Sequence, residues 1–379
     1  MDDAYPAISD LAAAARRRIP HFAWEYLDSG TTDDVAMHGN RAALDRVKMV
    51  PRLLKGAQAT DLSVTLFGQG YAAPIGMAPI GMGGLMWPGA ELLLADTARR
   101  GRVPYCLSTV AARTPEDVGP VAGDMAWFQL YPPRDPEVRR DLLARARDSG
   151  FRVLVVTVDI PAPSRRERQV RSGMSVHNAG VRPRMVAQML ARPRWLAETL
   201  RGPRATLATV AKYAGTRNME AVRAHFIRLN HNPSMDYLRT LRDEWDGPLV
   251  VKGILHPEDA VMVAEAGADG VWVSNHGGRQ FDAAPAAIDM LPGVVAVLGG
   301  RVPVIFDSGI RTGLDIARAV ALGADFCFAG RAFLYGAAAA GQAGADHALR
   351  ILTADLENAM RQFGAETLAD LRRAGDTRA

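Results

Sequence analysis

A histidine and an arginine lie three positions apart in residues 274–280, which read SNHGGRQ. The apolar run 270–273 precedes them and predicts a buried strand. The two glycines permit a sharp turn, so His276 and Arg279 would be presented at the carboxyl end of that strand. A histidine accepts a proton near neutral pH, and an arginine holds a carboxylate through two parallel hydrogen bonds. The stretch therefore predicts chemistry at the carbon next to an acid group, although a polar turn with a capped histidine would explain a lone His-Gly-Gly equally well.

The rest of the chain alternates between strand-like and helix-like segments, and this alternation predicts the scaffold. The expected strands are residues 74–78, 103–108, 126–130, 151–158, 248–251, 270–273, 302–306 and 325–329. The expected helices are residues 89–100, 115–121, 136–149, 234–245, 257–266, 286–298, 313–322 and 333–363. Eight strand–helix pairs predict an α/β protein with a closed (β/α)8 TIM barrel. A doubly wound open sheet is the structural alternative, but no GxGxxG motif follows the first strand to indicate a dinucleotide site.

We expect a single domain over residues 1–379, with the barrel over about 72–365. Residues 7–27 predict an opening helical segment that begins at Ser9 or Asp10 and stops at Ser29-Gly30. About forty residues of loop and short strand should follow it. A long, irregular and basic insertion, at about 163–233, separates the fourth strand from its helix.

The bulk composition is that of an ordinary globular protein. Of the 379 residues, 48% are hydrophobic and 23% charged, and the net charge is 45 − 41 = +4. This excess is mild, so we expect no nucleic-acid partner. Cys106 and Cys327 both lie in apolar runs, which predicts buried thiols without a disulfide framework or a metal site. The acidic N-terminus leads into no apolar stretch typical of a signal peptide, which favours a cytoplasmic protein.

Functional residues of a TIM barrel gather at the carboxyl ends of its strands, and polar residues stand at several of these ends. They are Ser108, Gln129, Tyr131, Thr157, Asp159 and Lys252. The first strand ends instead at Pro79, Ile80 and Gly81, whose backbone could lie flat against a planar ring. Each polar residue alone could be a cap or turn residue, Gly81 could serve only its turn, and Lys252 could point to solvent.

Two glycine–arginine motifs follow the seventh and eighth strands. The first contains Asp307, Ser308, Gly309 and Arg311, and the second contains Gly330 and Arg331. Exposed backbone N–H groups, the start of a helix and a cationic side chain together favour a phosphate, which TIM barrels commonly bind at this place. Asp307 would suit sugar-like hydroxyls rather than the phosphate. Phosphate binding alone would fit many barrel enzymes.

The SNHGGRQ stretch resembles the active-site signature of the FMN-dependent α-hydroxy-acid oxidoreductases, the family of the glycolate oxidase, lactate oxidase and mandelate dehydrogenase type. The resemblance runs from about Asp10 to Phe363. It implies an FMN cofactor bound by Pro79, Ile80, Gly81, Ser108, Gln129, Thr157, Lys252, Ser274, Asp307, Ser308, Gly309, Arg311, Gly330 and Arg331. Lys252 would stabilise the negative charge of the reduced flavin. The departures are modest: Val110 stands where several members carry tryptophan, and Phe281 where leucine is commoner.

The same resemblance implies a substrate site. Tyr26, Arg166 and Arg279 would bind the carboxylate, with Arg165 a less well-spaced alternative to Arg166. His276 would be the base, Asp159 would orient it, and Tyr131 would hydrogen-bond the reacting hydroxyl. The implied reaction is oxidation of an L-2-hydroxy acid, such as lactate or mandelate, to its 2-oxo acid, with O₂ or a quinone as the final electron acceptor. Because Gly81 and Val110 are small, we expect a large or aromatic acid to be preferred.

Three other classes of protein remain open at this point. An FMN-dependent barrel isomerase of the isopentenyl-diphosphate type would not need a base beside two arginines. A phosphate-sugar barrel enzyme would not need the polar residues at the other strand ends. A non-catalytic flavin carrier would have little use for the base.

The basic insertion could contact a membrane. Residues 180–217 carry eight basic residues against Glu198, a net charge of 8 − 1 = +7, with apolar residues between them. Such a segment can lie in an anionic membrane surface, here the inner face of the membrane. A lid over the flavin or a subunit contact is the competing interpretation, because Pro183, Pro193 and Pro203 exclude one long helix. The resemblance also implies a homotetramer or homo-octamer.

Overall fold

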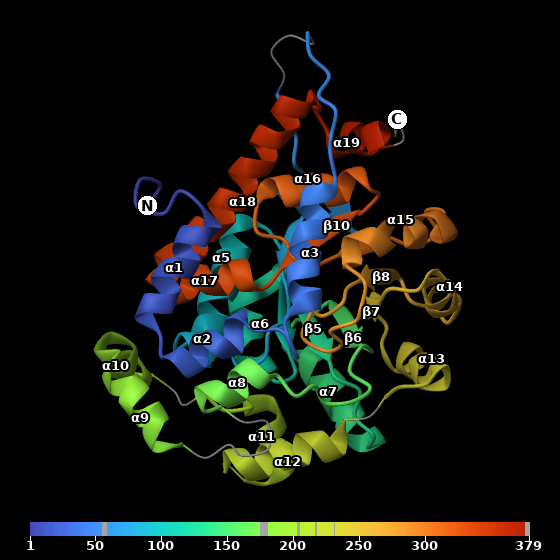
Figure 1. Cartoon of the computed structure of the whole chain (residues 1–379). Helices are drawn as coiled ribbons and strands as arrows, with labels where there is room; N and C mark the ends of the chain where they lie inside the picture. Colours follow the sequence, from blue (N-terminus) through green and yellow to red (C-terminus); the bar gives the residue numbers. More distant parts are fainter. Residues whose placement is uncertain (55–58, 175–180, 203–204, 217, 231, 376–379) are drawn as a thin grey trace.

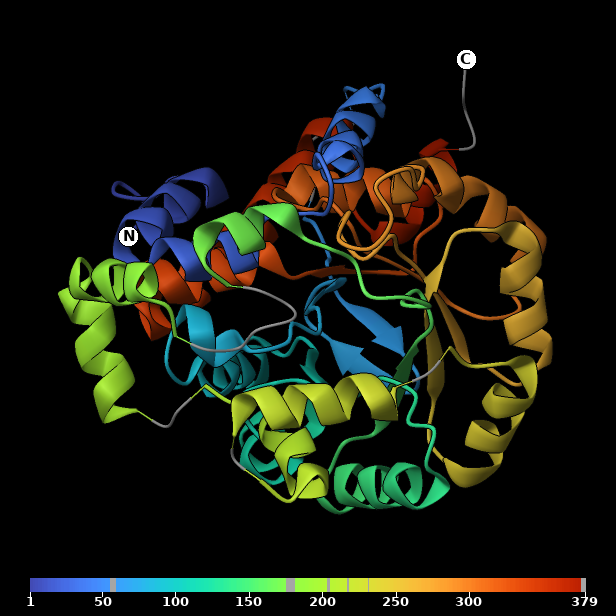
Figure 2. The ribbon, with the colours of Figure 1, turned by 60° about the horizontal axis from the view of Figure 1, so that its bottom comes forward.

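The computed structural model describes residues 1–54, 59–174, 181–202, 205–216, 218–230 and 232–375. Parallel strands close into an eight-membered barrel in the order β10-β3-β4-β5-β6-β7-β8-β9 (Figures 1 and 2), which confirms the predicted (β/α)8 architecture. The barrel strands are β3 (Ile75–Met77), β4 (Tyr105–Ser108), β5 (Ala126–Leu130), β6 (Val153–Thr157), β7 (Leu249–Ile254), β8 (Gly270–Val273), β9 (Val304–Phe306) and β10 (Phe326–Ala329).

Aromatic side chains fill the interior of the barrel. The rings of Trp272 and Phe328 lie 4.2 Å apart, and Trp127 lies 5.1 Å from Phe328. Gly76 on β3 faces this cluster, where an added Cβ atom would come within 2.4 Å of the Phe328 ring. The strand therefore needs glycine at this position, because the interior is already packed to density.

A short hairpin closes the amino-terminal end of the barrel. It consists of β1 (Val64–Leu66) and β2 (Gln69–Tyr71), which pair antiparallel. The Trp127 indole donates a hydrogen bond to the Tyr71 hydroxyl at 3.0 Å, and both side chains are buried. With this end sealed, the opposite end, where the strands have their carboxyl termini, is the one open to chemistry.

Helices surround the barrel, and each follows the strand it covers. They are α5 (Ala90–Gly101), α6 (Pro115–Ala122), α7 (Pro136–Asp148), α13 (Met235–Glu244), α14 (Pro257–Glu265), α15 (Ala287–Leu298), α16 (Gly313–Ala321) and α17 (Arg331–Ala340). The additional elements of the barrel region are α4 (Gly83–Met86), the 3₁₀ helix η1 (Gly123–Met125), α18 (Gln342–Phe363) and α19 (Leu368–Gly375). Predicted and observed bounds differ by a few residues at most, apart from the closing segment, which is two helices separated at Gly341.

The N-terminal segment differs from its prediction in three ways. It forms two helices, α1 (Ile8–Arg18) and α2 (His21–Asp28), because Pro20 disfavours helical backbone at the preceding Ile19. The N-cap is Ala7 rather than Ser9 or Asp10, and the Asp10 carboxylate accepts the Ala7 N–H at 3.0 Å. A third helix, α3 (Val35–Arg46), occupies part of the stretch expected to be loop.

The insertion after β6 is also more regular than expected. It contains α8 (Glu167–Ser172), α9 (Pro183–Leu190), α10 (Pro193–Arg201), α11 (Ala208–Ala214) and α12 (Met219–Leu229). Pro183 and Pro193 each occupy the first turn of a helix, where a missing N–H costs nothing, so residues 183–201 form two short helices rather than one long helix, as the prolines predicted. Gly180, Pro203, Arg204 and Arg217 lie outside the described residues. Within the described part of the chain, no helix is both long and apolar enough to cross a membrane.

Candidate active site

The turn after β8 places His276 against Asp159 from the loop after β6. His276 adopts a left-handed backbone conformation, with φ of 56°, and its N–H donates to the Ser274 hydroxyl at 3.0 Å. Its ring atom Nδ1 lies 2.9 Å from Asp159 Oδ1. Gly253 at the end of β7 makes this approach possible, because a Cβ atom there would come within 2.5 Å of the Asp159 side chain.

Burial governs the protonation of this pair. It lowers the pKa of His276, and the charge of Lys252 acts in the same direction, while the Asp159 carboxylate opposes both. Burial acts to raise the pKa of Asp159, but His276 and Lys252 outweigh it, so the pKa of that carboxyl lies below its usual value. At neutral pH the site therefore holds a neutral imidazole that can accept a proton, with a carboxylate behind it to stabilise the imidazolium.

Arg279 and Tyr26 come from opposite ends of the chain and meet beside this pair. Arg279 Nη1 donates to the backbone oxygens of Tyr26 and Ser29 at 2.9 and 2.8 Å, and its guanidinium lies 5.4 Å from the centre of the Tyr26 ring. The Tyr26 hydroxyl donates to the Gly81 carbonyl at 3.1 Å. Burial lowers the pKa of Arg279, and the neighbouring charge of Arg166 adds to this effect. Arg279 donates both of these hydrogen bonds from Nη1, so its other nitrogens can face an incoming carboxylate.

The structure distinguishes between the two candidate arginines of the loop after β6. The Arg165 side chain is 87% exposed and lies 3.8 Å from Glu167. Arg166 is partly buried, its Nε donates to the Ser164 hydroxyl at 3.0 Å, and its charge acts on His276, Arg279 and Tyr131. Arg166 is therefore the one that lies with the other candidate substrate residues. Burial raises the pKa of Tyr131, which keeps its hydroxyl protonated and able to donate.

A second group of strand-end residues lies deeper in the barrel mouth. The Lys252 ammonium is buried, donates to the Ser274 hydroxyl at 2.9 Å and lies 3.3 Å from Asp307. Ser108 donates to the Gln129 Oε1 atom at 2.9 Å. Among the described residues, the buried Gln129 Nε2 atom has no hydrogen-bond partner. A buried donor of this kind requires an acceptor, and a carbonyl or ring nitrogen of a flavin would supply one. Thr157 is also buried at this level.

The glycine–arginine motifs border a cavity of about 280 Å³. It is lined by Gly277, Gly309, Arg311 and Arg331 from the barrel loops, and by residues of α1, α2, α3 and α17, including Asn40 and Tyr335. Arg311 and Arg331 give this cavity a positive charge that suits a phosphate. Arg331 has a second task, because its guanidinium donates to the carbonyls of Leu27, Gly277 and Ser29 at 2.9–3.0 Å.

Ser308 and Asp307 form part of the loop framework here. The Ser308 hydroxyl donates to Asp307 and accepts the N–H groups of Asn275 and Gly277, so it helps to shape the turn that carries the histidine. Gly330 is the N-cap of α17 and lies against Ile80, since a Cβ atom there would come within 2.8 Å of the isoleucine side chain. Pro79, Ile80 and Gly81 thus lie close to the second phosphate motif.

Sequence reasoning missed several residues that position this site. Arg168 is one of them: it donates to Glu25, Asp34 and Asp28 at 2.7, 2.6 and 3.0 Å and so ties the insertion to α2. The available signal was charge: residues 25–34 carry several acids, and residues 165–168 carry three arginines. Nothing in the sequence indicates that these two segments meet in the fold.

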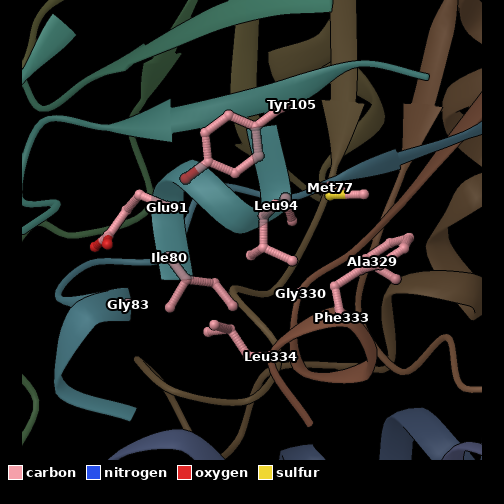
Figure 3. A pocket seen from close by; sticks show the side chains of 11 residues that line it. Met77, Ile80, Gly83, Glu91, Leu94, Tyr105, Ala329, Gly330, Phe333 and Leu334 are labelled. Atoms are coloured by element: carbon pink, nitrogen blue, oxygen red, sulfur yellow. The ribbon is translucent and has the colours of Figure 1, made fainter. Parts of the chain in front are cut away.

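Glu91 was missed as well. It is buried, and its Oε1 atom accepts the N–H groups of Gly84 and Ala112 at 3.0 and 2.9 Å, which joins the loops after β3 and β4. It lines a cavity of only about 10 Å³ behind Ile80, beside Tyr105 (Figure 3). This cavity is too small for a ligand. The sequence signal for Glu91 was its position as a single carboxylate in the apolar run that follows Pro88.

Comparisons with known proteins identify the family of the chain. Residues 15–376 match the family model of FMN-dependent dehydrogenases. The chain is 39% identical over 368 residues to an L-lactate dehydrogenase of Ectopseudomonas mendocina (strain ymp), covering 96% of this chain and 97% of that protein. It is 37% identical over 370 residues to an L-lactate dehydrogenase of Yersinia pestis (strain Pestoides F), covering 97% of each.

Solved structures give the same result. A monotopic membrane protein, (S)-mandelate dehydrogenase, superposes with a TM-score of 0.91 at 33% identity, covering 96% of this chain and 97% of that one. A mandelate oxidase gives 0.83 at 34% identity, covering 97% of each chain. The predicted enzyme class and the predicted FMN cofactor are confirmed, and the chain belongs to the FMN-dependent dehydrogenase family.

Proposed function

We propose that the protein oxidises an L-2-hydroxy acid to its 2-oxo acid. The observation that carries this proposal is a buried His276–Asp159 pair, 2.9 Å apart, beside Arg279 and Arg166. A proton acceptor next to two guanidinium groups suits a substrate whose reacting C–H and O–H groups adjoin a carboxylate. The relatives are described as L-lactate dehydrogenases and as mandelate dehydrogenase or oxidase, which supports the same reaction class.

Each of these side chains has a separate role in the proposed reaction. Arg279, Arg166 and Tyr26 would fix the substrate carboxylate and so orient the neighbouring carbon. His276 would take a proton through Nε2 while Asp159 stabilises the imidazolium, and the Tyr131 hydroxyl would hydrogen-bond the substrate oxygen. FMN supplies the acceptor for the two electrons. Lys252 would offset negative charge on the cofactor, and Gln129, with Ser108 and Thr157, would bond the polar edge of its ring.

The test is anaerobic reduction of the purified, yellow holoenzyme. L-Lactate or (S)-mandelate should bleach the flavin, whereas the D-enantiomers should not. His276→Gln should retain its FMN and reduce it ~10²–10⁴-fold more slowly, the usual cost of losing an acid–base group. If the variant reduced its flavin at the parental rate, or if no L-2-hydroxy acid bleached the parent, this assignment would be wrong.

We further propose that α9 and α10 attach the protein to the inner face of an anionic membrane. Leu190 and Leu200 are 65% and 77% exposed, and Arg194 and Arg201 are exposed beside them. Exposed apolar and cationic side chains on these neighbouring helices suit such a membrane. A solved relative is described as a monotopic membrane protein.

Trp195, which belongs to α10, does not take part in this surface. It is buried, and its indole donates to the Met86 carbonyl at 3.1 Å, so it anchors α10 to the barrel.

Co-sedimentation with anionic vesicles tests the membrane proposal. The double variant Leu190→Ser/Leu200→Ser should bind less than the parent, and Leu53→Ser, which changes a leucine that is 75% exposed elsewhere, should bind like the parent. Negligible binding by all three proteins would exclude the membrane and leave a lid or subunit contact. The electron acceptor, O₂ or a quinone, stays a prediction, which reoxidation in air can measure. The homotetrameric or homo-octameric state also stays a prediction, which light scattering can measure.

A further inference from the structure

The turn that carries His276 has a backbone conformation that needs support. His276, Gly277 and Gly278 follow one another in the left-handed region, with φ of 56°, 66° and 73°. Residues other than glycine rarely adopt this conformation, and it persists only where the surrounding structure determines it. The Ser274 hydroxyl accepts the His276 N–H at 3.0 Å. The Ser308 hydroxyl accepts the Gly277 N–H at 3.1 Å. Both serines follow barrel strands, so these bonds support the turn from the barrel.

A pair of buried amides joins the same turn to the N-terminal segment. Asn40 on α3 and Asn275, the residue before His276, exchange two hydrogen bonds: Nδ2 of each donates to Oδ1 of the other at 2.8 Å. The two residues are only 2% and 5% exposed. Asn275 Oδ1 also accepts the Gly278 N–H at 3.1 Å, and Asn40 Oδ1 accepts the Ala287 N–H at the same distance. The amide pair therefore holds the loop that contains His276 near both of its ends.

Two further contacts hold α3 against this loop. An added Cβ atom on Gly278 would lie 2.4 Å from the backbone nitrogen of Met37, so the helix backbone packs directly on the turn. At the start of the helix, the Asp282 carboxylate accepts the N–H groups of Asp33 and Ala36 at 3.1 and 2.9 Å. The Ala36 N–H belongs to the first turn of α3, where donors lack an intrahelical partner. The loop after β8 therefore caps the helix, and the helix supports the loop.

We propose that Asn40 is a positioning residue of the reaction, which acts through Asn275 to hold the turn that presents His276. This inference rests on the proposed function. It gives α3, which lies in a stretch expected to be loop, a part in the reaction. The competing role is purely structural, in which the amide pair would only fasten α3 to the barrel.

The two roles predict different effects of removing the amide. Without Asn40, the Asn275 side chain retains the Gly278 N–H and the Pro285 carbonyl, which are partners within its own loop. The turn is then no longer tied to a fixed helix, and the imidazole of His276 can move relative to the substrate. A misplacement of about 1 Å at a reacting group can cost roughly 100-fold in rate. A purely structural role predicts lower stability without a loss that depends on the histidine.

The experiment is a double-mutant cycle on the FMN holoenzyme. The limiting rate of anaerobic flavin reduction is measured for the parent, Asn40→Ala, His276→Gln and the double variant, with whichever of L-lactate and (S)-mandelate reduces the parent faster. Saturating substrate excludes changes in affinity that act through Arg279. Gln342→Ala is the matched control, because this partly buried amide joins α18 to the Leu93 carbonyl of α5 on the outside of the barrel. The FMN content and thermal midpoint of every variant are measured alongside.

Hydrogen exchange gives a second readout that does not depend on turnover. The backbone N–H groups of Gly278 and Ala287 both bond to the amide pair, so their exchange reports directly on the hold of α3. Residues 275–287 should exchange faster in Asn40→Ala than in the parent, whereas Gln342→Ala should match the parent there. Unchanged exchange in Asn40→Ala would show that the amide does not hold this loop.

We expect Asn40→Ala to keep its FMN and to lower the limiting rate roughly 10- to 100-fold. In the His276→Gln background the same change should cost less than about threefold, because no base remains to be positioned. Gln342→Ala should keep the parental rate even where its thermal midpoint falls. The inference is overturned if Asn40→Ala reduces its flavin at the parental rate, or if it loses the same factor in both backgrounds.

Asp282→Ala repeats the measurement if Asn40→Ala does not fold or loses its FMN. It removes the acceptor at the start of α3 from a partly exposed position, and it should slow the parent about threefold or more but not His276→Gln. A loss that is equal in both backgrounds, or no loss in either, again overturns the inference. All of these results leave the proposed function intact, because a 2-hydroxy acid still reduces the parent's flavin. If no L-2-hydroxy acid does so, the proposed function itself fails.

Discussion

Replacing Asp159 by asparagine should slow flavin reduction by about 10- to 150-fold. The carboxylate lies 2.9 Å from His276 Nδ1, and the two side chains are only 12% and 17% exposed, so solvent screens the interaction weakly. A hydrogen bond to a charged group in such a place contributes about 1.5–3 kcal/mol. The bond strengthens when His276 becomes an imidazolium, and each ~1.4 kcal/mol lost from that state costs a factor of ten in rate.

The same change should move the pH dependence in a defined direction. Burial and the Lys252 charge lower the pKa of His276, and Asp159 is the group that opposes them. Without its carboxylate the pKa of His276 falls further, so the neutral imidazole persists to lower pH. The acidic limb of the reduction rate should therefore shift to lower pH while the plateau falls.

Anaerobic stopped-flow measurement of flavin reduction across the acidic and neutral range provides the assay. Asp236→Asn, which changes a carboxylate that is 89% exposed, is the matched control and should leave both the plateau and the limb unchanged. If the plateau rate of Asp159→Asn fell but its acidic limb did not move, the loss would reflect general damage to the protein rather than the loss of the partner of His276. An Asp159→Asn protein with the parental rate and limb would refute the reasoning outright.

Three further predictions concern other parts of the site. Arg279→Lys should weaken substrate binding about 10-fold or more in titrations of the reduction rate, because lysine cannot reproduce the planar fork; an unchanged curve would contradict this. Arg168→Met should cost about 3–5 kcal/mol and lower the thermal midpoint, since it leaves three largely buried carboxylates unpaired, whereas the exposed Arg165→Met should have little effect. Burial raises the pKa of Glu91 above 4.5, so the stability that its neutral form contributes is lost as the pH rises. Glu91→Gln, which keeps the acceptor but cannot ionise, should match the parent's thermal midpoint in acid and exceed it increasingly toward neutral pH; a constant difference would contradict the buried-carboxyl argument.

The barrel was predictable from sequence because each strand is a short apolar run followed at once by the residues that matter. Val153–Thr157 and Gly270–Val273 are buried along their whole length, and such runs have one plausible place in an α/β protein. Once the strands were identified, their carboxyl ends located His276, Asp159 and Lys252 in the mouth of one barrel. Because the strands are parallel, residues that directly follow different strands in the sequence lie at the same end of the barrel.

The insertion was less predictable because nothing local determines where its helices dock. The prolines correctly excluded one long helix, since Pro183 and Pro193 each start a short one, α9 and α10. Where these helices dock depends on remote contacts, such as the hydrogen bond from the Trp195 indole to a carbonyl about 110 positions earlier in the chain. Phe226 carries no motif at all, and only the contact of its ring with the Tyr131 ring places it beside the site.

The carboxyl end of α2 links the two halves of the site. Arg279, the proposed carboxylate ligand, and Arg331, which lines the cavity proposed to bind the phosphate, both donate to the Ser29 carbonyl, at 2.8 and 2.9 Å. They also bond the carbonyls of Tyr26 and Leu27. Carbonyls at a helix carboxyl end carry partial negative charge, so they offset the cost of burying two guanidinium groups. The N-terminal segment lies outside the barrel, yet its carbonyls hold the guanidinium groups of Arg279 and Arg331 in place relative to each other. In the proposed reaction it would therefore set the alignment of substrate and cofactor.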